Sequence, residues 1–207
     1  VFSKVFDQMI IPELKDQKIF LLRRLDLNDE QQIFVEAYFK DNMLPYVQPV
    51  LLHQKRIRPF LNNAALYLTL WLKPIENPNA PNEYALVKMP SDQLPRFIHL
   101  PASAPGRQDM IMLDDIVRHS VSWMFPGYAI EDTYSIKLTR DAELYIDDEF
   151  SGDLLQKIRS SLTKRQVGST SRFVYDRDMP LAMLDVLKEV FALEKYDTLR
   201  EGRYHNN

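Results

Sequence analysis

Residues 66–72 read LYLTLWL, and this strict alternation constrains the fold more than any other feature of the chain. Leucine occupies every second position, and Tyr67, Thr69 and Trp71 occupy the positions between. Successive side chains of a β-strand point to opposite faces, so one face of this segment is aliphatic and the other is largely aromatic. The segment therefore predicts a strand that is covered on both faces.

Other segments show helical or strand periodicity, and their order indicates the fold class. Helices are expected in VFSKVFDQMI, LNDEQQIFVEAYFKDNM, LDDIVRHSVSWMF, DLLQKIRSSL and PLAMLDVLKEVF, and further strands in YALVKM, RFIHL, DTYSIKLTR and SRFVYD. Two helices precede the first strand, and the later elements alternate irregularly. This order favours an α+β fold, in which N-terminal helices are followed by a mixed or antiparallel sheet with packed helices, over a doubly wound fold.

The two N-terminal helices are predicted from their boundaries and their apolar stripes. Pro12 is expected to end or kink the first helix, because proline has no N–H to donate. Asn28 is a suitable N-cap for the second helix, which Pro45 and Pro49 are expected to close. The expected apolar stripes are Phe2, Val5, Phe6, Met9 and Ile10 in the first helix and Ile33, Phe34, Ala37 and Tyr38 in the second.

The length and composition are those of a globular protein. The chain has 207 residues, of which 45% are hydrophobic and 27% are charged. We expect one domain over 1–207, with a helical front over 1–60 and an α+β body over 61–207. The Pro-rich segment 74–83 is the best candidate for a seam between the helical front and the body. Because the chain opens on Val and closes on YHNN, we also expect it to be a piece of a longer protein.

Composition excludes several classes of function. The formal net charge of −3 gives no long-range attraction to a polyanion such as DNA. The absence of cysteine excludes disulfides and any zinc or iron–sulfur site with cysteine ligands. No window approaches the roughly 20 apolar residues that a membrane-spanning helix needs.

The acidic stretch 141–149 is the first candidate for a metal or acid/base site. An EF-hand loop needs Gly at its sixth position, where counting from Asp141 gives Ile146. Alternating apolar residues run through the stretch, so the acids fall on the opposite face of a strand or at its end. Asp147, Asp148 and Glu149 precede the helix expected in the 150s, whose N-terminus favours negative charge. We interpret the stretch as structural and predict no metal site there.

Histidines and glycines give no catalytic or nucleotide-binding motif. The histidines at 53, 99, 119 and 205 form no HExxH pattern, and we interpret His119 as a surface or core-edge residue. The five glycines are too far apart for a P-loop or a GxGxxG motif. We therefore predict no catalytic, cofactor-binding or metal-binding residue in this chain.

Basic residues form two short runs that are capable of meeting phosphates. These runs contain Lys55, Arg56 and Arg58 in the basic loop 53–58, and Lys164 and Arg165. Solvated surface charge is the favoured interpretation of both. Arg140, inside a predicted strand, is expected to have a carboxylate partner such as Asp141.

Several segments together resemble the middle, or head, domain of polyphosphate kinases of the long bacterial type. They are PELKDQKI, YFKDNMLPYVQPVLL, PFLNNAALYLTLWL, YALVKMP, LPRFIHLP, MLDDIVRHSVSWMFPGY, SIKLTRDAELYIDDE, SRFVYDRDMP and EGRYHNN. The resemblance spans nearly the whole chain, and LTRDAEL and PRFIHLP are its most specific parts. The helical N-terminal domain of that family and its two phospholipase-D-like catalytic domains have no counterpart in this sequence.

The resemblance implies a parent enzyme that moves the terminal phosphoryl group of ATP to a polyphosphate chain with magnesium, by way of a phosphohistidine. It implies that this domain is non-catalytic, contributes to dimerisation and helps to frame the catalytic tunnel. The implied partners are the enzyme's own N-terminal and C-terminal domains and a second subunit, with polyphosphate as substrate and product and no nucleic acid. The implied location is the cytoplasm, with peripheral association at the inner membrane.

Two hypotheses of function follow. The first is a non-catalytic, interface-forming domain of a polyphosphate kinase. The second is a module that binds polyphosphate or another polyanion through the two basic runs, against which the acidic net charge stands. A free-standing metal hydrolase that uses the acids of 141–149 is a third, less favoured hypothesis.

Overall fold

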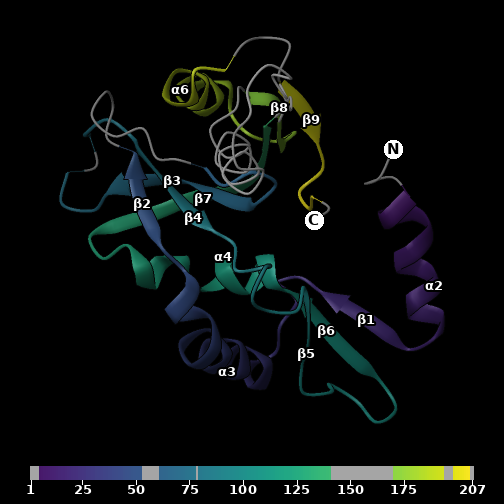
Figure 1. Cartoon of the computed structure of the whole chain (residues 1–207). Helices are drawn as coiled ribbons and strands as arrows, with labels where there is room; N and C mark the ends of the chain where they lie inside the picture. Colours follow the sequence, from purple (N-terminus) through teal and green to yellow (C-terminus); the bar gives the residue numbers. More distant parts are fainter. Residues whose placement is uncertain (1–4, 53–60, 78, 141–169, 194–197, 206–207) are drawn as a thin grey trace, which may run out of the picture.

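The computed structural model describes residues 5–52, 61–77, 79–140, 170–193 and 198–205 (Figure 1). The larger of its two sheets consists, in spatial order, of β2 (Pro49–Leu52), β4 (Glu83–Lys88), β3 (Leu66–Pro74), β7 (Tyr128–Arg140), β8 (Thr170–Asp176) and β9 (Thr198–Glu201). Neighbouring strands are antiparallel except β8 and β9, which are parallel. This mixed sheet confirms the α+β class that the order of elements predicted.

A smaller, three-stranded sheet lies apart from the first. It consists of β1 (Ile19–Leu22), β6 (Gln108–Met112) and β5 (Phe97–His99), in that order. Strand β1 is parallel to β6, and β5 is antiparallel to it. The sequence predicted β5 but not β1 or β6.

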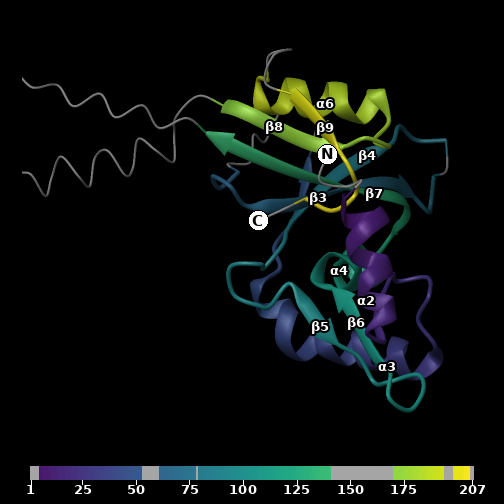
Figure 2. The same cartoon turned by 90° about the vertical axis from the view of Figure 1, so that its right-hand side faces the viewer.

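Strand β3 is covered on both faces, as its alternation predicts. Its leucines lie in one core together with α3 (Asp29–Tyr38) and α4 (Leu113–Met124). Tyr67 lies in the second core, together with α6 (Leu181–Phe191). Figure 2 shows α6 over one face of the large sheet and α4 on the other side. Burial of each of these leucines contributes about 1.5–3 kcal/mol.

The Pro-rich segment is not a seam. Strands β3 and β4 are antiparallel neighbours, with Trp71 opposite Tyr84, so residues 75–82 connect two adjacent strands of one sheet. Val35, Phe39 and Met43 lie in the same core as the leucines of β3. The second predicted helix therefore packs directly on the sheet.

The first predicted helix continues through Pro12 instead of ending there. It consists of a π-helical turn, η1 (Phe6–Ile10), followed by α2 (Ile11–Asp16), with Pro12 in the first turn of α2. The N–H of Ile11 donates to the carbonyl oxygen of Phe6, five residues back. Because Pro12 occupies the first turn of α2, where backbone N–H groups need no partner within that helix, it is tolerated.

Helix α3 begins as predicted, and the face that it turns to the core overlaps the predicted stripe only in part. The side chain of Asn28 accepts from the N–H of Gln31, and the side chain of Gln31 accepts from the N–H of Asn28, which forms a capping box. Val35 and Phe39 are buried, and Phe34 and Tyr38 of the predicted stripe pack against the same core, whereas Ile33 is 70% exposed, so the predicted stripe is correct only in part. Gln31 is the cause, because it is buried and donates to Pro101 O (2.9 Å) and to Asp109 Oδ2 (3.0 Å). These bonds direct Gln31 inward, and Ile33, two residues on, lies on the far side.

The helical path also runs past Pro45, which was expected to close it. A π-helical turn, η2 (Phe39–Met43), and a 3₁₀ turn, η3 (Leu44–Tyr46), follow α3. Pro45 lies at the start of the 3₁₀ turn, where its missing N–H costs nothing. Pro49 begins β2.

Helix α4 and strand β7 agree with their predicted periods. Leu113, Ile116, Val117 and Val121 of α4 are buried. Tyr134, Ile136 and Leu138 of β7 share the core that includes α6. Gly127, with φ of +89°, lies in the turn between the two elements, where a side chain is unfavourable. The acids of 141–149 and the helix expected at 154–162 lie outside the described residues.

Candidate functional site

Helix α4 carries a row of charged residues that is as buried as its apolar row. Asp114, Asp115 and Arg118 each keep only 1–2% of their exposure. Charged side chains are almost never this buried unless they are paired. The elements that cover them are strand β7 and residues 202–205, which we call the C-terminal strap.

Arg118 joins α4 to β7. Its Nε donates to Thr133 Oγ1 (3.1 Å) and its Nη2 to Ser135 Oγ (2.7 Å). Thr133 and Ser135 are two residues apart on β7, so both hydroxyls point to the face that α4 covers. The carbonyl oxygen of Arg118 accepts from Arg24 Nη1 (3.1 Å). One guanidinium nitrogen, Nη1, has no hydrogen-bond partner among the described residues.

Each of the last three residues of the strap has its own contact with the body. Ser135 Oγ donates to Arg203 O (2.7 Å), and Tyr204 Oη donates to Asp115 Oδ2 (2.5 Å). Arg96 Nη2 donates to His205 O (2.8 Å). Two of these three contacts fix the backbone of the strap, so they hold its path and not only its side chains.

Arg96 links the strap to the start of α4. Its Nε and Nη2 donate to the two carboxylate oxygens of Asp114, at 2.9 and 3.0 Å. This two-point arrangement fixes the guanidinium plane, and the same Nη2 then reaches His205 O. The strap is therefore bonded to a partly buried arginine that two hydrogen bonds hold to Asp114.

Burial controls the protonation of this cluster. Desolvation, together with the smaller effects of the charges of Arg118 and Arg96, lowers the pKa of His205 to about 4, so His205 is neutral at pH 7. The nearby backbone of Gly202 acts in the opposite direction and raises the pKa of His205. Neither ring nitrogen, however, has a hydrogen bond of normal geometry to a described residue. Desolvation and then Asp115 raise the pKa of Tyr204, which keeps its hydroxyl protonated as a donor.

The same effects act on the cationic and acidic members of the cluster. Desolvation, followed by the charge of Arg203, lowers the pKa of Arg118, while Asp115 and Asp114 raise it. An arginine remains charged under these conditions. Desolvation raises the pKa of Asp176, which is 1% exposed, although Arg118 and Arg203 oppose this effect.

This cluster is suited to holding a segment of chain. Asp114 is occupied by Arg96 and Asp115 by Tyr204, so neither is poised as a free base. Within the described ranges, no three potential metal ligands of the His, Cys, Asp or Glu type come together. What the geometry provides is a rigid junction between α4, β7 and the strap.

Most residues that the sequence singled out as candidate sites lie outside the described residues. Both basic runs, with Lys55, Arg56, Arg58, Lys164 and Arg165, lie outside the described residues, and so do His53 and the acids of 141–149. The polyanion hypothesis and the hydrolase hypothesis therefore stay predictions. Arg140 is the last residue of β7, next to Thr170 of β8.

The remaining histidines occupy three different environments. His99 is exposed on β5. His119 is partly exposed on α4, with its Nε2 3.8 Å from Glu36 Oε1, which agrees with the interpretation of a core-edge residue. His205 is buried in the strap.

Sequence reasoning missed the charged row of α4 as a site. Asp114 and Arg118 are four residues apart, which places them on one face of a helix, and this spacing was a readable signal. Tyr204 and His205 gave no such signal, because their partners are 89 and 109 residues earlier in the chain. The described residues contain no helix with the length and apolarity that a membrane crossing requires.

Comparison with known proteins gives the family. The polyphosphate kinase middle domain family matches residues 30–207. Polyphosphate kinases of Salmonella typhimurium strain LT2 and Escherichia coli strain K12 are each 35% identical over 211 residues, which is 99% of this chain and 30% of theirs. The chain thus spans about a third of the length of these curated relatives.

A solved structure agrees with this assignment. The crystal structure of polyphosphate kinase from Porphyromonas gingivalis superposes with a TM-score of 0.79 at 28% identity. The superposition covers 98% of this chain and 28% of that one. By sequence and by fold, this chain belongs to the polyphosphate kinase middle domain family.

Proposed function

We propose that this chain is the head domain of a polyphosphate kinase, that it carries no catalytic group, and that its strap fixes the path of the chain toward the catalytic part of the enzyme. The parent enzyme transfers the terminal phosphoryl group of ATP to polyphosphate with magnesium. Support comes from the family match over 30–207 and from relatives that are about three times as long. The observation that carries the role of the strap is its three separate contacts with α4, β7 and Arg96.

Incubation of the 207-residue chain with ATP and Mg²⁺ tests the non-catalytic part of this proposal. We expect no polyphosphate, whereas the E. coli polyphosphate kinase synthesises it under the same conditions as a positive control. Polyphosphate made by a preparation free of contaminating kinase would overturn the proposal.

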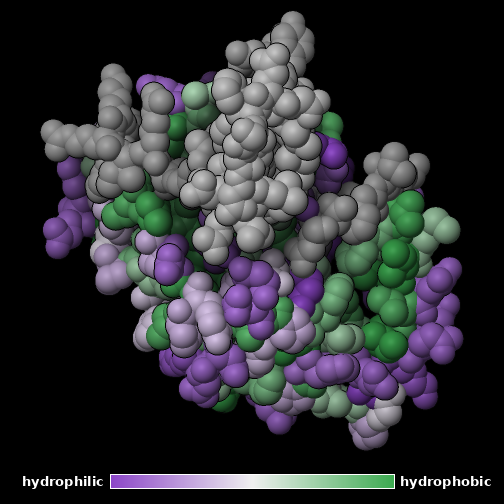
Figure 3. Space-filling view, viewed as in Figure 1, coloured by the Kyte–Doolittle hydropathy of each residue, from purple (hydrophilic) through white to green (hydrophobic). Residues whose placement is uncertain are grey.

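The proposed domain also contributes to dimerisation and helps to frame the catalytic tunnel of the parent enzyme. An exposed apolar surface on the N-terminal helical segment supports a role in assembly. Val5, Met9 and Ile10 are 40–57% exposed there, and Figure 3 shows hydrophobic residues along the edge where α2 lies in Figure 1. Exposed apolar patches of this kind mark interaction surfaces.

Sedimentation equilibrium tests the assembly role. We expect a weak dimer whose fraction rises with protein concentration, and a Met9→Asp variant that remains monomeric. The exposed Glu13→Gln variant serves as a control that leaves the equilibrium unchanged. A chain that stays monomeric at every concentration would contradict this part of the proposal.

A further inference from the structure

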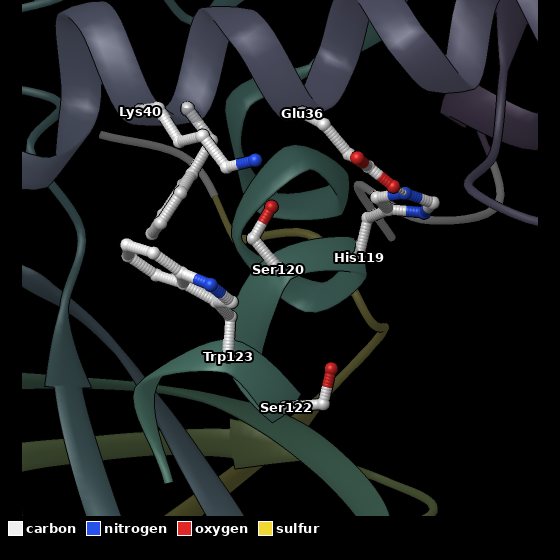
Figure 4. Close-up of a pocket in the computed structure, with 7 residues that line it drawn as sticks. Glu36, Lys40, His119, Ser120, Ser122 and Trp123 are labelled. Carbon is white, nitrogen blue, oxygen red and sulfur yellow. Dashed lines mark ion pairs between the residues drawn. The ribbon is translucent and has the colours of Figure 1, made fainter. Parts of the chain in front are cut away.

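A pocket lies between α4 and the α3–η2 segment, away from the strap contacts (Figure 4). Glu36, Lys40, Ser120 and Trp123 line it, together with Phe39 and His119. Its volume is about 160 Å³. Pockets for drug-sized ligands measure about 300–1,000 Å³. This pocket is therefore too small for a nucleoside triphosphate and suits a much smaller molecule.

The first unusual feature of the pocket is a pair of opposite charges, on Glu36 and Lys40, that do not form an ion pair with each other. Glu36 and Lys40 are four residues apart along one helical face, which is the spacing of a salt bridge. Among the described residues, however, no ion pair joins them. Lys40 Nζ instead lies 5.9 Å from the centroid of the Trp123 ring, and Glu36 Oε1 lies 3.8 Å from His119 Nε2. Each charge thus lies near a side chain of α4.

The second feature is a buried hydroxyl between these charges. Ser120 is 7% exposed, and its Oγ has no hydrogen-bond partner among the described residues. Figure 4 shows this oxygen pointing into the space between Lys40 and Glu36. Leaving such a group without a partner costs about as much as a lost hydrogen bond. A helical serine commonly bonds the carbonyl four residues back, but this one points into the pocket.

Together these groups form a slot with a cation at one end, a carboxylate at the other and a hydroxyl in the middle. A simple anion would meet Lys40 but would be repelled by Glu36, and a simple cation would face the reverse problem. The 3.8 Å separation of Glu36 from His119 is too long for a hydrogen bond, so the carboxylate keeps its capacity to accept. The slot is complementary to a ligand that carries both charges.

We propose that this pocket binds a free α-amino acid in its zwitterionic form. The carboxylate of the ligand accepts from Lys40 Nζ and Ser120 Oγ, and its ammonium group donates to Glu36. The exposed indole of Trp123 covers the ligand side chain, as aromatic rings do in small-ligand sites. This binding activity is independent of polyphosphate synthesis.

Fluorescence of Trp123 provides the test. The chain has two tryptophans, and a Trp71→Phe background leaves Trp123 as the only reporter. The probes are the free L-amino acids, with acetate and methylamine as ligands that carry one charge each. At least one amino acid should give a saturable change at about millimolar concentration, as expected for so small a ligand, and acetate and methylamine should bind at least about tenfold more weakly. Calorimetric titration of the unmodified chain repeats the measurement without the background substitution.

Matched variants identify the binding groups. Glu36→Gln and Lys40→Gln should each weaken binding at least about tenfold, whereas Glu13→Gln and Lys15→Gln on α2 should leave it unchanged. Ser120→Ala should also weaken binding but should not lower stability, because its hydroxyl makes no bond to a described residue. No saturable signal with any amino acid would overturn the proposal. So would binding of acetate as tight as that of the amino acids, or full affinity in Glu36→Gln.

Discussion

Acidification of the protein tests the burial of His205 in the strap. The pKa of this histidine falls from its ordinary value of 6.5 to about 4 in the folded chain. As the pH falls below 6.5, the unfolded chain binds a proton on His205 and the folded chain does not. Stability from this group is therefore complete above pH 6.5 and decreases between 6.5 and about 4. The full decrease amounts to about 3 kcal/mol.

Urea denaturation at about pH 7 and about pH 4.5 measures this loss, most of which should be reached at the lower pH. Asp176 acts in the opposite sense, because its raised pKa makes protonation favour the folded state as the pH falls. The positive charges that face His205 from the neighbouring elements are Arg118, Arg96 and Lys137. A loss of about 2–3 kcal/mol is large against a typical total of about 5–15 kcal/mol.

A His205→Leu variant isolates the group responsible. Neither ring nitrogen has a hydrogen bond of normal geometry to a described residue, so leucine removes at most a weak contact with the backbone of Gly202 and fills a similar volume. This variant should lose the pH-dependent decrease, while His99→Gln, at an exposed site on β5, should keep it. An equal decrease in His205→Leu and in the unmodified chain would refute the assignment to His205.

Three further substitutions test other parts of the structure by urea denaturation. Asn28→Ala should lower the unfolding free energy by about 1 kcal/mol, because it removes the cap of α3; an unchanged midpoint would contradict the capping box. Ala192→Gly should raise it by about 1 kcal/mol, because Ala192 has a φ of +52° at the end of α6; a decrease would show that the residue is not strained. Arg118→Lys should lower the unfolding free energy by about 3 kcal/mol, because an ammonium group cannot replace the planar guanidinium that donates to two hydroxyls of β7. Full stability in this variant would contradict the proposed junction between α4, β7 and the strap.

The parts of the fold with strong local periodicity could be predicted from the sequence. Strand β3 and helix α4 each carry a long, regular apolar pattern, and both form where that pattern places them. Strands β1 and β9 have only four residues each, which is too short for a pattern to stand out from chance. They are strands because β6 and β8 pair with them.

Two errors have the same origin in contacts that are distant in sequence. The face of α3 is selected by Gln31, whose partners Pro101 and Asp109 lie about seventy residues later in the chain. The burial of Asp115 likewise depends on Tyr204, 89 residues later. Local spacing shows which residues share a helical face, but it does not show which face the rest of the protein covers.

Polyphosphate synthesis by the longer enzyme tests the central claim most directly. In that enzyme, Tyr204→Phe combined with Ser135→Ala removes two of the three strap contacts, while Tyr46→Phe, at an exposed tyrosine, serves as the control. Misplacement of a catalytic group by about 1 Å can cost about 100-fold in rate. The account predicts a loss of about this size in a protein that remains folded, with increased proteolysis at the strap. Full activity despite a released strap would contradict it.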